Sequence, residues 1–305
     1  MKRVIPAIAR LAVVVFCLGL FVISSHAQAE DRLTVYTVNY PLAYFTERVG
    51  GNQVKVVFPA PADVDPAYWS PETQTVIEFQ KADLIIINGA DYAKWLTKVS
   101  LPKSRIVNTT KDISDRYIPL EQSLTHNHGP SGAHSHEGVA FTVWLDLDIA
   151  VHQAERIAAA LGRKIPGQKS YFQNNLDVLK KELLSIDKRL LALGKLYSAF
   201  PLLGSHPVYQ YFKARYGFNL TSVHWEPDQQ PTGQQIAELK EILKQHQATI
   251  MIWEGEPEDS TRRTLEDLGL QSVVFDPCGN HPGEGNFLDV LKKNTAHIEK
   301  ALTSK

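Results

Sequence analysis

The sequence predicts an α/β protein in which two lobes are joined by one long helix, with a cleft between the lobes. Three observations lead to this prediction. Short apolar runs alternate with amphipathic helical segments in both halves of the chain, as in parallel sheets with helical crossovers. An uninterrupted amphipathic stretch separates the two halves. Finally, polar residues with chemically useful side chains follow several of the apolar runs.

The amino terminus has the features of a secretory signal peptide. Met1-Lys2-Arg3 is basic, residues 11–23 are apolar except at Cys17 and Gly19, and Ala27-Gln28-Ala29 supplies small residues before a cleavage point. About 13 apolar residues are too few to span a bilayer comfortably. We expect residues 1–29 to be a signal peptide cleaved after Ala29, and the mature protein to lie in the periplasm.

Charge and cysteine content exclude several classes of protein. Without Lys2, Arg3 and Arg10, the formal charge moves from -1 to about -4. A mildly acidic chain gives no reason to expect nucleic acid as a partner. Cys17 leaves with the signal peptide, so Cys278 remains alone and no internal disulfide forms. Stability must come from an ordinary core, for which about 276 residues suffice.

Residues 30–165 are expected to form the first lobe. Residues 33–38 alternate like a strand, and the run 84–87 is short and unalternating, which is typical of a buried parallel strand. The full prediction comprises strands at 33–38, 54–58, 84–87 and 105–108, with helices at 42–49, 71–81 and 92–99.

Residues 166–198 are expected to form a linking spine helix. Apolar residues recur in alternating steps of four and three with no proline among them: Phe172, Leu176, Leu179, Leu183, Ile186, Leu190 and Leu193. The pattern predicts one helix of about 30 residues and about 45 Å. Because α/β segments flank it on both sides, a rigid spine across two lobes explains it better than a coiled coil.

Residues 199–305 are expected to form the second lobe, which repeats the α/β pattern. The predicted strands are 201–204, 218–223, 249–253 and 272–275, and the predicted helices are one that ends at Tyr216 and others at 234–246, 261–268 and 286–302. Polar residues at the carboxyl ends of these strands should line the cleft between the lobes.

Three such residues are candidate metal ligands. His206, Glu254 and Asp276 each follow a predicted strand of the second lobe. One imidazole with one or two carboxylates suits zinc or manganese. The structural alternative is a helix-capping or core histidine and a turn carboxylate before Pro277. Their shared position at strand ends favours a metal cleft.

A second candidate is a histidine-rich loop at residues 126–136. His126, His128, His134 and His136 form two His-Xaa-His pairs around the segment 129–133. That segment is too rich in glycine and too poor in apolar groups for a buried helix or strand. Such a loop can offer several imidazoles to a soft or borderline cation. The alternative is a solvated linker, which is disfavoured because four of the eleven histidines lie within these eleven residues.

Several local strings, in their order along the chain, resemble the zinc- and manganese-binding solute receptors of bacterial ABC importers, the ZnuA-like cluster A-I group. The matching strings cover nearly the whole mature chain and are Tyr40-Pro41-Leu42-Ala43-Tyr44, Ala82-Asp83-Leu84 with Asn88-Gly89, Trp144-Leu145-Asp146, Ser205-His206 with Tyr211-Phe212 and Tyr216-Gly217, and Phe275-Asp276-Pro277. The resemblance implies a monomeric, non-catalytic receptor. It would deliver zinc, manganese or another divalent transition metal to a permease with its ATPase.

The resemblance also implies four ligands, of which this chain retains two. His206 and Asp276 match the ligands of the second lobe, whereas the two histidines expected in the first lobe fall on Ala67 and Thr142. Neither alanine nor threonine binds zinc usefully. Half of the usual site is therefore missing.

Replacement ligands can be proposed. His136 lies six residues before Thr142 and could enter the cleft, Glu254 could contribute from the second lobe, and Cys278 could add a thiolate. His224 is a weaker candidate, because a histidine beside aromatic residues is more often structural. The tryptophans near the proposed cleft segments, namely Trp69, Trp144, Trp225 and Trp253, predict an aromatic wall.

Other functions stay open. A metallochaperone or metal buffer would act mainly through the histidine-rich loop and need no importer. A zinc hydrolase would need an open coordination position and a general base, and the sequence has no His-Glu-Xaa-Xaa-His string. With Ala67 and Thr142 in place of histidines, the cleft could also have changed to a non-metal or metal–chelate ligand.

Overall fold

The computed structural model describes residues 32–120, 125–127, 133–135 and 138–304. The expected signal peptide, His128 and His136 lie outside these residues. We call residues 33–165 the first half and residues 199–304 the second half. The strands are β1 (Leu33–Thr37), β2 (Val54–Val57), β3 (Leu84–Ile87), β4 (Ile106–Asn108), β5 (Thr125–Asn127), β6 (Ala133–Ser135), β7 (Pro201–Gly204), β8 (Asn219–Ser222), β9 (Ile250–Trp253) and β10 (Gln271–Val274).

Helices connect these strands. They are α2 (Tyr40–Gly50), α3 (Thr73–Lys81), α4 (Leu147–Lys164), α5 (Lys169–Leu196), α6 (Gln210–Tyr216), α7 (Gly233–His246), α8 (Asp259–Asp267) and α9 (Phe287–Thr303). In the described part of the chain, none of them is both long and apolar enough to cross a membrane.

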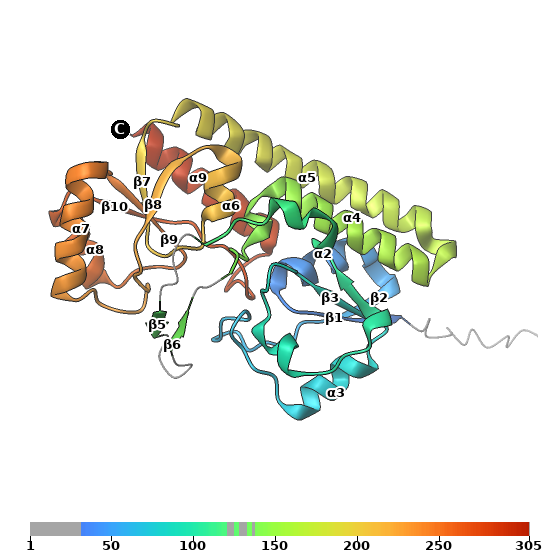
Figure 1. Ribbon diagram of the computed structural model, residues 1–305. Helices are drawn as coiled ribbons and strands as arrows, with labels where there is room; N and C mark the ends of the chain where they lie inside the picture. The colour runs from blue at the N-terminus through green and yellow to red at the C-terminus, as the bar shows by residue number, and fades with distance from the viewer. Residues whose placement is uncertain (1–31, 121–124, 128–132, 136–137, 305) are drawn as a thin grey trace, which may run out of the picture. The chain divides into compact units, whose positions relative to one another are not determined.

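Two parallel four-stranded sheets form the core of the two halves (Figure 1). The first has the order β2-β1-β3-β4 and the second the order β10-β9-β7-β8, with every pairing parallel. The central strand β9 has the sequence Ile-Met-Ile-Trp and is buried throughout, as expected for a strand covered on both faces. The predicted α/β fold with a long helix is confirmed.

The long helix α5 packs against both halves. It contacts α2 and α4 from the first half, and α6 and α9 from the second; Figure 1 shows α5 running alongside α4. The predicted apolar stripe is buried along its whole length, from Phe172 to Leu193. A single rigid element therefore supports both sheets.

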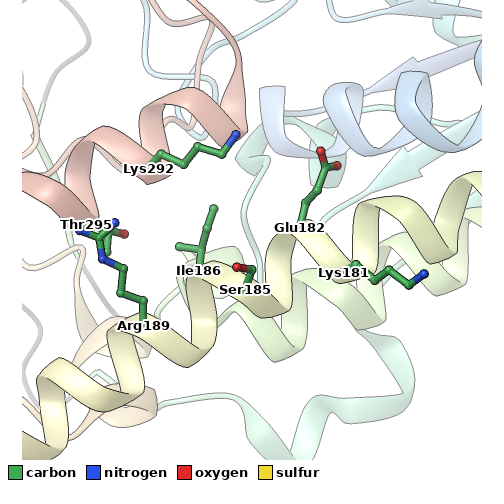
Figure 2. Close-up of a pocket in the computed structure, with 7 residues that line it drawn as sticks. All are labelled: Lys181, Glu182, Ser185, Ile186, Arg189, Lys292 and Thr295. Atoms are coloured by element: carbon green, nitrogen blue, oxygen red, sulfur yellow. The ribbon is translucent and has the colours of Figure 1, made fainter.

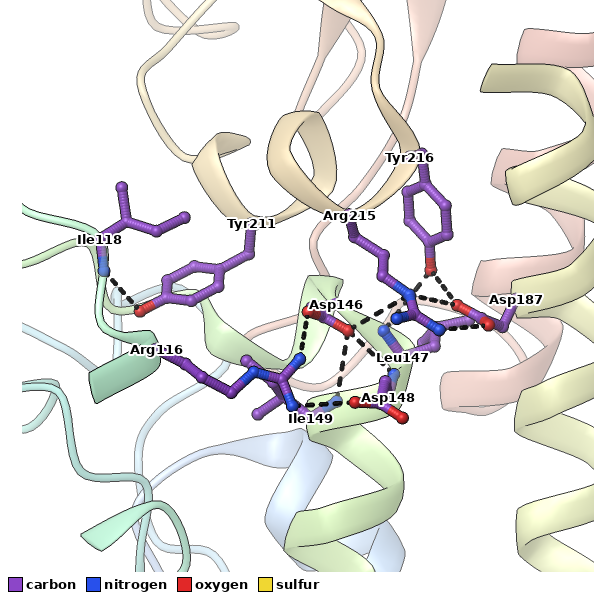
Figure 3. Close-up of polar contacts among 10 residues, drawn as sticks. All are labelled: Arg116, Ile118, Asp146, Leu147, Asp148, Ile149, Asp187, Tyr211, Arg215 and Tyr216. Carbon is purple, nitrogen blue, oxygen red and sulfur yellow. Dashed lines mark hydrogen bonds and ion pairs between the residues drawn. The ribbon is translucent and has the colours of Figure 1, made fainter. Parts of the chain in front are cut away.

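A buried polar network ties α6 to the long helix and to the start of α4 (Figure 3). The Arg215 guanidinium donates to both carboxylate oxygens of Asp187, at 3.1 and 2.8 Å, and Tyr216 Oη donates to the same carboxylate at 3.1 Å. Arg215 also lies 3.6 Å from Asp146, which caps α4 by accepting from two backbone N–H groups. Since Asp187 is 4% exposed, loss of Arg215 would leave a buried charge uncompensated.

Direct hydrogen bonds also cross between the halves. Thr142 Oγ1 donates to the Val208 carbonyl at 2.5 Å, and Trp144 Nε1 donates to the Pro277 carbonyl at 2.7 Å. The Asn280 amide donates to two first-half carbonyls, those of Pro61 and Val64. These bonds fix the two carboxyl-end regions close to each other.

Three local predictions differ from the structure. Residues 92–99 form only a 3₁₀ turn, Lys94–Lys98, because the backbone at Ala93 is extended, with φ -80° and ψ 94°, and so interrupts a helix that begins at Tyr92. Helix α4, Leu147–Lys164, was not predicted from the sequence. In the histidine-rich segment, β5 and β6 pair as a short antiparallel ribbon with His126 opposite His134, where only a loop is expected.

Candidate metal centre

Four potential ligands follow the four strands of the second sheet. His206 lies two residues after β7, Glu254 immediately after β9, and Asp276 two residues after β10. Glu226 lies four residues after β8. Because the sheet order is β10-β9-β7-β8, His206 comes between the two glutamates. We call these four residues the donor row.

The donor row is closely spaced around its histidine. His206 Nδ1 lies 3.3 Å from Glu254 Oε1, and His206 Nε2 lies 3.5 Å from Glu226 Oε1. The His206 side chain is only 10% exposed. An imidazole held between two carboxylates in this way is a suitable environment for a cation.

The donor row opens into a cavity of about 810 Å³, the cleft cavity. Both halves of the chain contribute to it, and its lining residues are Ala62, Asp63, Val64, Asp65, Pro66, Tyr68, Tyr92, Leu120, Ala140, Phe141, Thr142, Trp144, His206, Pro207, Val208, Gln210, Glu226, Pro227, Asp228, Gln229, Glu254, Asp276, Pro277, Gly279 and Asn280. The lining includes six carboxylates and one imidazole, and neither lysine nor arginine. The cavity therefore favours a positively charged ligand.

Two carboxyl groups of the cleft cavity, those of Glu254 and Asp276, have a raised pKa. The pKa of Glu254 is well above its usual value, mainly because the group is buried and further because Glu226, Asp65 and Asp276 are close. Burial also raises the pKa of Asp276, while the Cys278 N–H and Lys293 oppose this shift. Gathering these acids is electrostatically unfavourable, and a bound cation would relieve the repulsion.

The backbone around Asp276 is held firmly in place. Asp276 Oδ1 accepts from the Cys278 N–H at 2.7 Å. Buried Asn294 on α9 accepts from the Asp276 N–H at 3.1 Å and donates to the Asp276 carbonyl at 2.7 Å. One carboxylate oxygen is thus used by the turn, which leaves the other for a ligand.

Aromatic rings from the first half also line the cleft cavity. Tyr68, Tyr92, Phe141 and Trp144 all line the cleft cavity. They make an edge-to-face series, with centroid separations of 6.1 Å for Tyr68–Phe141, 5.4 Å for Tyr92–Phe141 and 5.5 Å for Tyr92–Trp144. We call these four residues the ring wall.

The predicted tryptophan wall is mostly wrong. Trp144 alone among the four predicted tryptophans lines the cleft cavity. Trp225 and Trp253 pack into the core of the second half, and Trp69 packs against Trp95. Most of the predicted tryptophans pack away from the cavity, and the other aromatic residues that line it are tyrosine and phenylalanine.

The positions of the two missing histidines carry no metal ligand. Ala67 is fully buried and has only a methyl group. Thr142 lines the cleft cavity, but its hydroxyl donates to the Val208 carbonyl. Asp65 of the first half lines the cleft cavity, and its carboxylate accepts from the Ala67 N–H at 2.8 Å.

Cys278 and His224 are poor candidates. Cys278 is 2% exposed and is not among the residues lining the cleft cavity. Burial, with Asp276 nearby, raises the pKa of its thiol far above the usual value, so a thiolate is disfavoured. His224 lies 6.0 Å from the His206 ring, measured between centroids, but does not line the cavity either.

The stem of the histidine-rich segment reaches the rim of the cleft cavity. Pro119 and Val139 form an antiparallel bridge, and backbone hydrogen bonds join Leu120 to Gly138 and Ala140 to Ile118. Leu120 and Ala140 both line the cavity. Both ends of the segment between them therefore start at this rim.

No complete metal site is formed by the described side chains. Among them, no three or more His, Cys, Asp or Glu residues are gathered so that they could hold a metal ion. The structure brings His206 together with Glu254 and Glu226, and places Asp276 on the same cavity. Glu226 was not singled out from sequence, because it lies four residues beyond the end of its strand and not directly after it.

A smaller cavity of about 350 Å³ lies between α5 and α9 (Figure 2). Its lining residues are Lys181, Glu182, Ser185, Ile186, Arg189, Lys292 and Thr295. Three cationic side chains against one carboxylate make this pocket unsuitable for a metal ion.

The chain is similar to known metal receptors. Residues 35–301 match the family model described as ZnuA, zinc-uptake complex component A, periplasmic. The zinc-binding lipoprotein AdcA of Streptococcus pneumoniae is 26% identical over 98% of this chain, which spans 61% of the length of AdcA. The high-affinity zinc uptake system protein ZnuA of Bacillus subtilis is 24% identical, covering 90% of this chain and 89% of that protein.

The fold has solved counterparts. The metal-dependent lipoprotein YcdH from Bacillus subtilis superposes with a TM-score of 0.75 at 22% identity, covering 88% of this chain and 98% of that one. Two parallel sheets and a long helix packed on both halves fit this comparison. The family model spans nearly all of the described residues, and the chain belongs to the ZnuA family of zinc-uptake components.

Proposed function

We propose that this protein captures a divalent transition-metal ion, zinc in the first place, and delivers it to an ABC importer. One observation carries the proposal: His206 lies between Glu254 and Glu226 on the cleft cavity, in a chain of this family. Relatives described as zinc-binding or zinc-uptake proteins support zinc, although manganese or another divalent transition metal would also suit the carboxylates.

The proposed ligands combine two sources. His206, Glu226, Glu254 and Asp276 belong to the cleft cavity, and His126, His128, His134 and His136 belong to the segment that starts at its rim. The two-lobe division at residues 165 and 199, with the spine helix between, is part of the same proposal. Binding rather than catalysis is the proposed mechanism, in which the ligands replace the metal's water and the spine helix limits how far the lobes move.

The cellular setting follows from the same proposal. The protein acts in the periplasm as a monomer after removal of residues 1–29, and its partners are a membrane permease and the associated ATPase. The family description, which names a periplasmic component of zinc uptake, supports this setting. Nucleic acid is not a partner.

The test is metal binding by protein purified without a histidine tag. Mature protein should bind at least one zinc ion per chain in calorimetric titration, and His206→Ala should weaken binding of the tightest one. Wild-type affinity in His206→Ala would contradict the cleft proposal. If deletion of residues 126–136 abolishes all binding while His206→Ala has no effect, the alternative of a periplasmic metal buffer acting through the loop is supported instead.

A further inference from the structure

The cleft cavity is larger than a metal ion needs. Six waters of a hydrated divalent ion would occupy roughly 180 Å³, at about 30 Å³ each, whereas the cavity measures about 810 Å³. Its volume lies within the range of small-molecule pockets, roughly 300–1,000 Å³. Most of the space is therefore available to something other than the ion and its water.

The two walls of the cavity differ in what they can bind. The donor row offers one imidazole and three carboxylates, while the ring wall offers four aromatic faces and edges. Aromatic side chains favour a flat or apolar body. Thr142 also lines the cavity, and its hydroxyl donates to the Val208 carbonyl. Neither Thr142 nor the ring wall offers a nitrogen atom that can coordinate a metal, because the indole N–H of Trp144 is a donor only.

Charge restricts the second molecule further. All six charged groups on the lining are carboxylates, so an anionic chelator would be repelled. A neutral or cationic nitrogen donor has no such penalty. It would also supply the borderline ligands that zinc and its neighbours prefer.

We propose that the cleft cavity binds its metal ion as a ternary complex with a small, flat nitrogen-donor molecule. This inference rests on the proposed metal-receptor function. The donor row holds the ion, the nitrogen atoms of the small molecule complete its coordination from the side of Thr142, and the body of that molecule packs against the ring wall.

Histamine is a suitable probe, because it carries an imidazole and an amine but no carboxylate; citrate is the matched anionic probe. Zinc affinity is measured by titration over a series of buffered free zinc concentrations, with each probe and without a probe. Native mass spectrometry measures the masses of the complexes. We expect histamine to raise zinc affinity at least tenfold and to give a protein–zinc–histamine mass. Citrate should give neither. Equal affinity with and without histamine, and no ternary mass, would overturn the inference.

Variants test whether the ring wall contributes to the binding of histamine. Phe141→Leu removes one ring of the ring wall and should reduce the gain from histamine severalfold, whereas Tyr171→Leu removes a half-exposed ring on α5, outside the cavity, and should not. Thr142→His returns an imidazole to the cavity and should make histamine superfluous. An undiminished gain in Phe141→Leu would overturn the proposed packing.

Two further outcomes identify the source of the nitrogen. If histamine acts only after residues 126–136 are deleted, the chain's own histidines supply the nitrogen and the ternary proposal is wrong. If zinc binds in no arm, including Thr142→His, the metal-receptor function fails. Zinc binding that ignores histamine in every variant overturns the ternary complex alone.

Discussion

The two sheets have the same topology. Across the first sheet the strands follow the order β2-β1-β3-β4, and across the second, taken from its β8 edge, the order β8-β7-β9-β10. Corresponding strands therefore end at corresponding places, but with different residues. The second sheet ends in charged and ionisable groups. The first ends in amides and hydroxyls, such as Asn39 and Asn88, that are fully buried and bonded to one another.

The bonds at the end of the first sheet are internal. Asn88 Oδ1 accepts from the side-chain amides of Asn39 at 3.4 Å and Gln153 at 3.1 Å. Asn88 Nδ2 donates to the Phe141 carbonyl at 3.0 Å, and Thr110 donates to the Asn88 carbonyl at 2.6 Å. The same topology thus supports a neutral, structural network in one half and a charged row facing a cavity in the other. Topology provides the place, and the residues decide its use.

Of the substitutions considered in the two halves, Asn88→Leu should have the largest effect, and that effect should be a loss of folding stability. The change leaves the amides of Asn39 and Gln153 and the carbonyl of Phe141 without this partner, at about 1–3 kcal/mol for each unsatisfied group. We expect the free energy of unfolding to fall by at least about 3 kcal/mol in urea titrations. Exposed Asn52→Leu is the control and should change it by less than about 0.5 kcal/mol. A similar small loss in Asn88→Leu would mean that the network is not structural.

Substitutions in the donor row should act on affinity instead. His206→Ala and Asp276→Ala should each weaken zinc binding at least tenfold, or about 1.4 kcal/mol, measured by competition with a chelating dye. Asp276→Asn keeps an oxygen acceptor for the Cys278 N–H and separates charge from turn structure. Exposed Glu241→Gln on α7 is the charge control. Unchanged affinity in both alanine variants would remove the contrast between the two sheets.

Deletion of residues 126–136 sharpens the comparison from the rim of the cavity. Because Ala67 and Thr142 leave the first half without its histidines, we expect the deletion to lower the affinity of the cleft as well as the number of zinc ions bound, by up to tenfold. Replacement of the four histidines by serine, with the length kept, is the matched variant. Wild-type affinity for one zinc ion in both proteins would assign the segment an accessory role.

The smallest expected effect concerns Glu254 and pH. Its pKa is raised above the usual 4.5 in the folded protein, so the metal-free fold is favoured below that pH and loses this contribution as pH rises through the folded pKa. Glu254→Gln should remove this decline in the free energy of unfolding with rising pH, measured by urea titration of metal-free protein at a series of pH values. Saturating zinc should reverse the slope in wild type, since the ligand must be deprotonated. Identical profiles for Glu254→Gln and wild type would contradict the assigned burial of this carboxyl.

Much of the second sheet could be predicted from sequence, because the change from an apolar run to polar residues marks the carboxyl end of a buried strand. His206, Glu254 and Asp276 lie within two residues of the ends of predicted strands and were identified. The strand before Glu226 was also predicted, but Glu226 lies four residues beyond the end of β8 and was not identified. Helix α4 was missed since alanines build much of its buried face. The ring wall could not be predicted, because its members come from separate segments that only tertiary packing brings together.

Trp144 has a consequence for observing this molecule at work. Its indole is 1% exposed, lines the cleft cavity and donates to the Pro277 carbonyl beside Asp276. Any shift of the Asp276 turn on arrival of cargo alters the polarity and hydrogen bonding that the excited indole senses. The tryptophan fluorescence spectrum of the unlabelled protein should therefore change as the cleft fills, and Trp144→Phe should abolish this change.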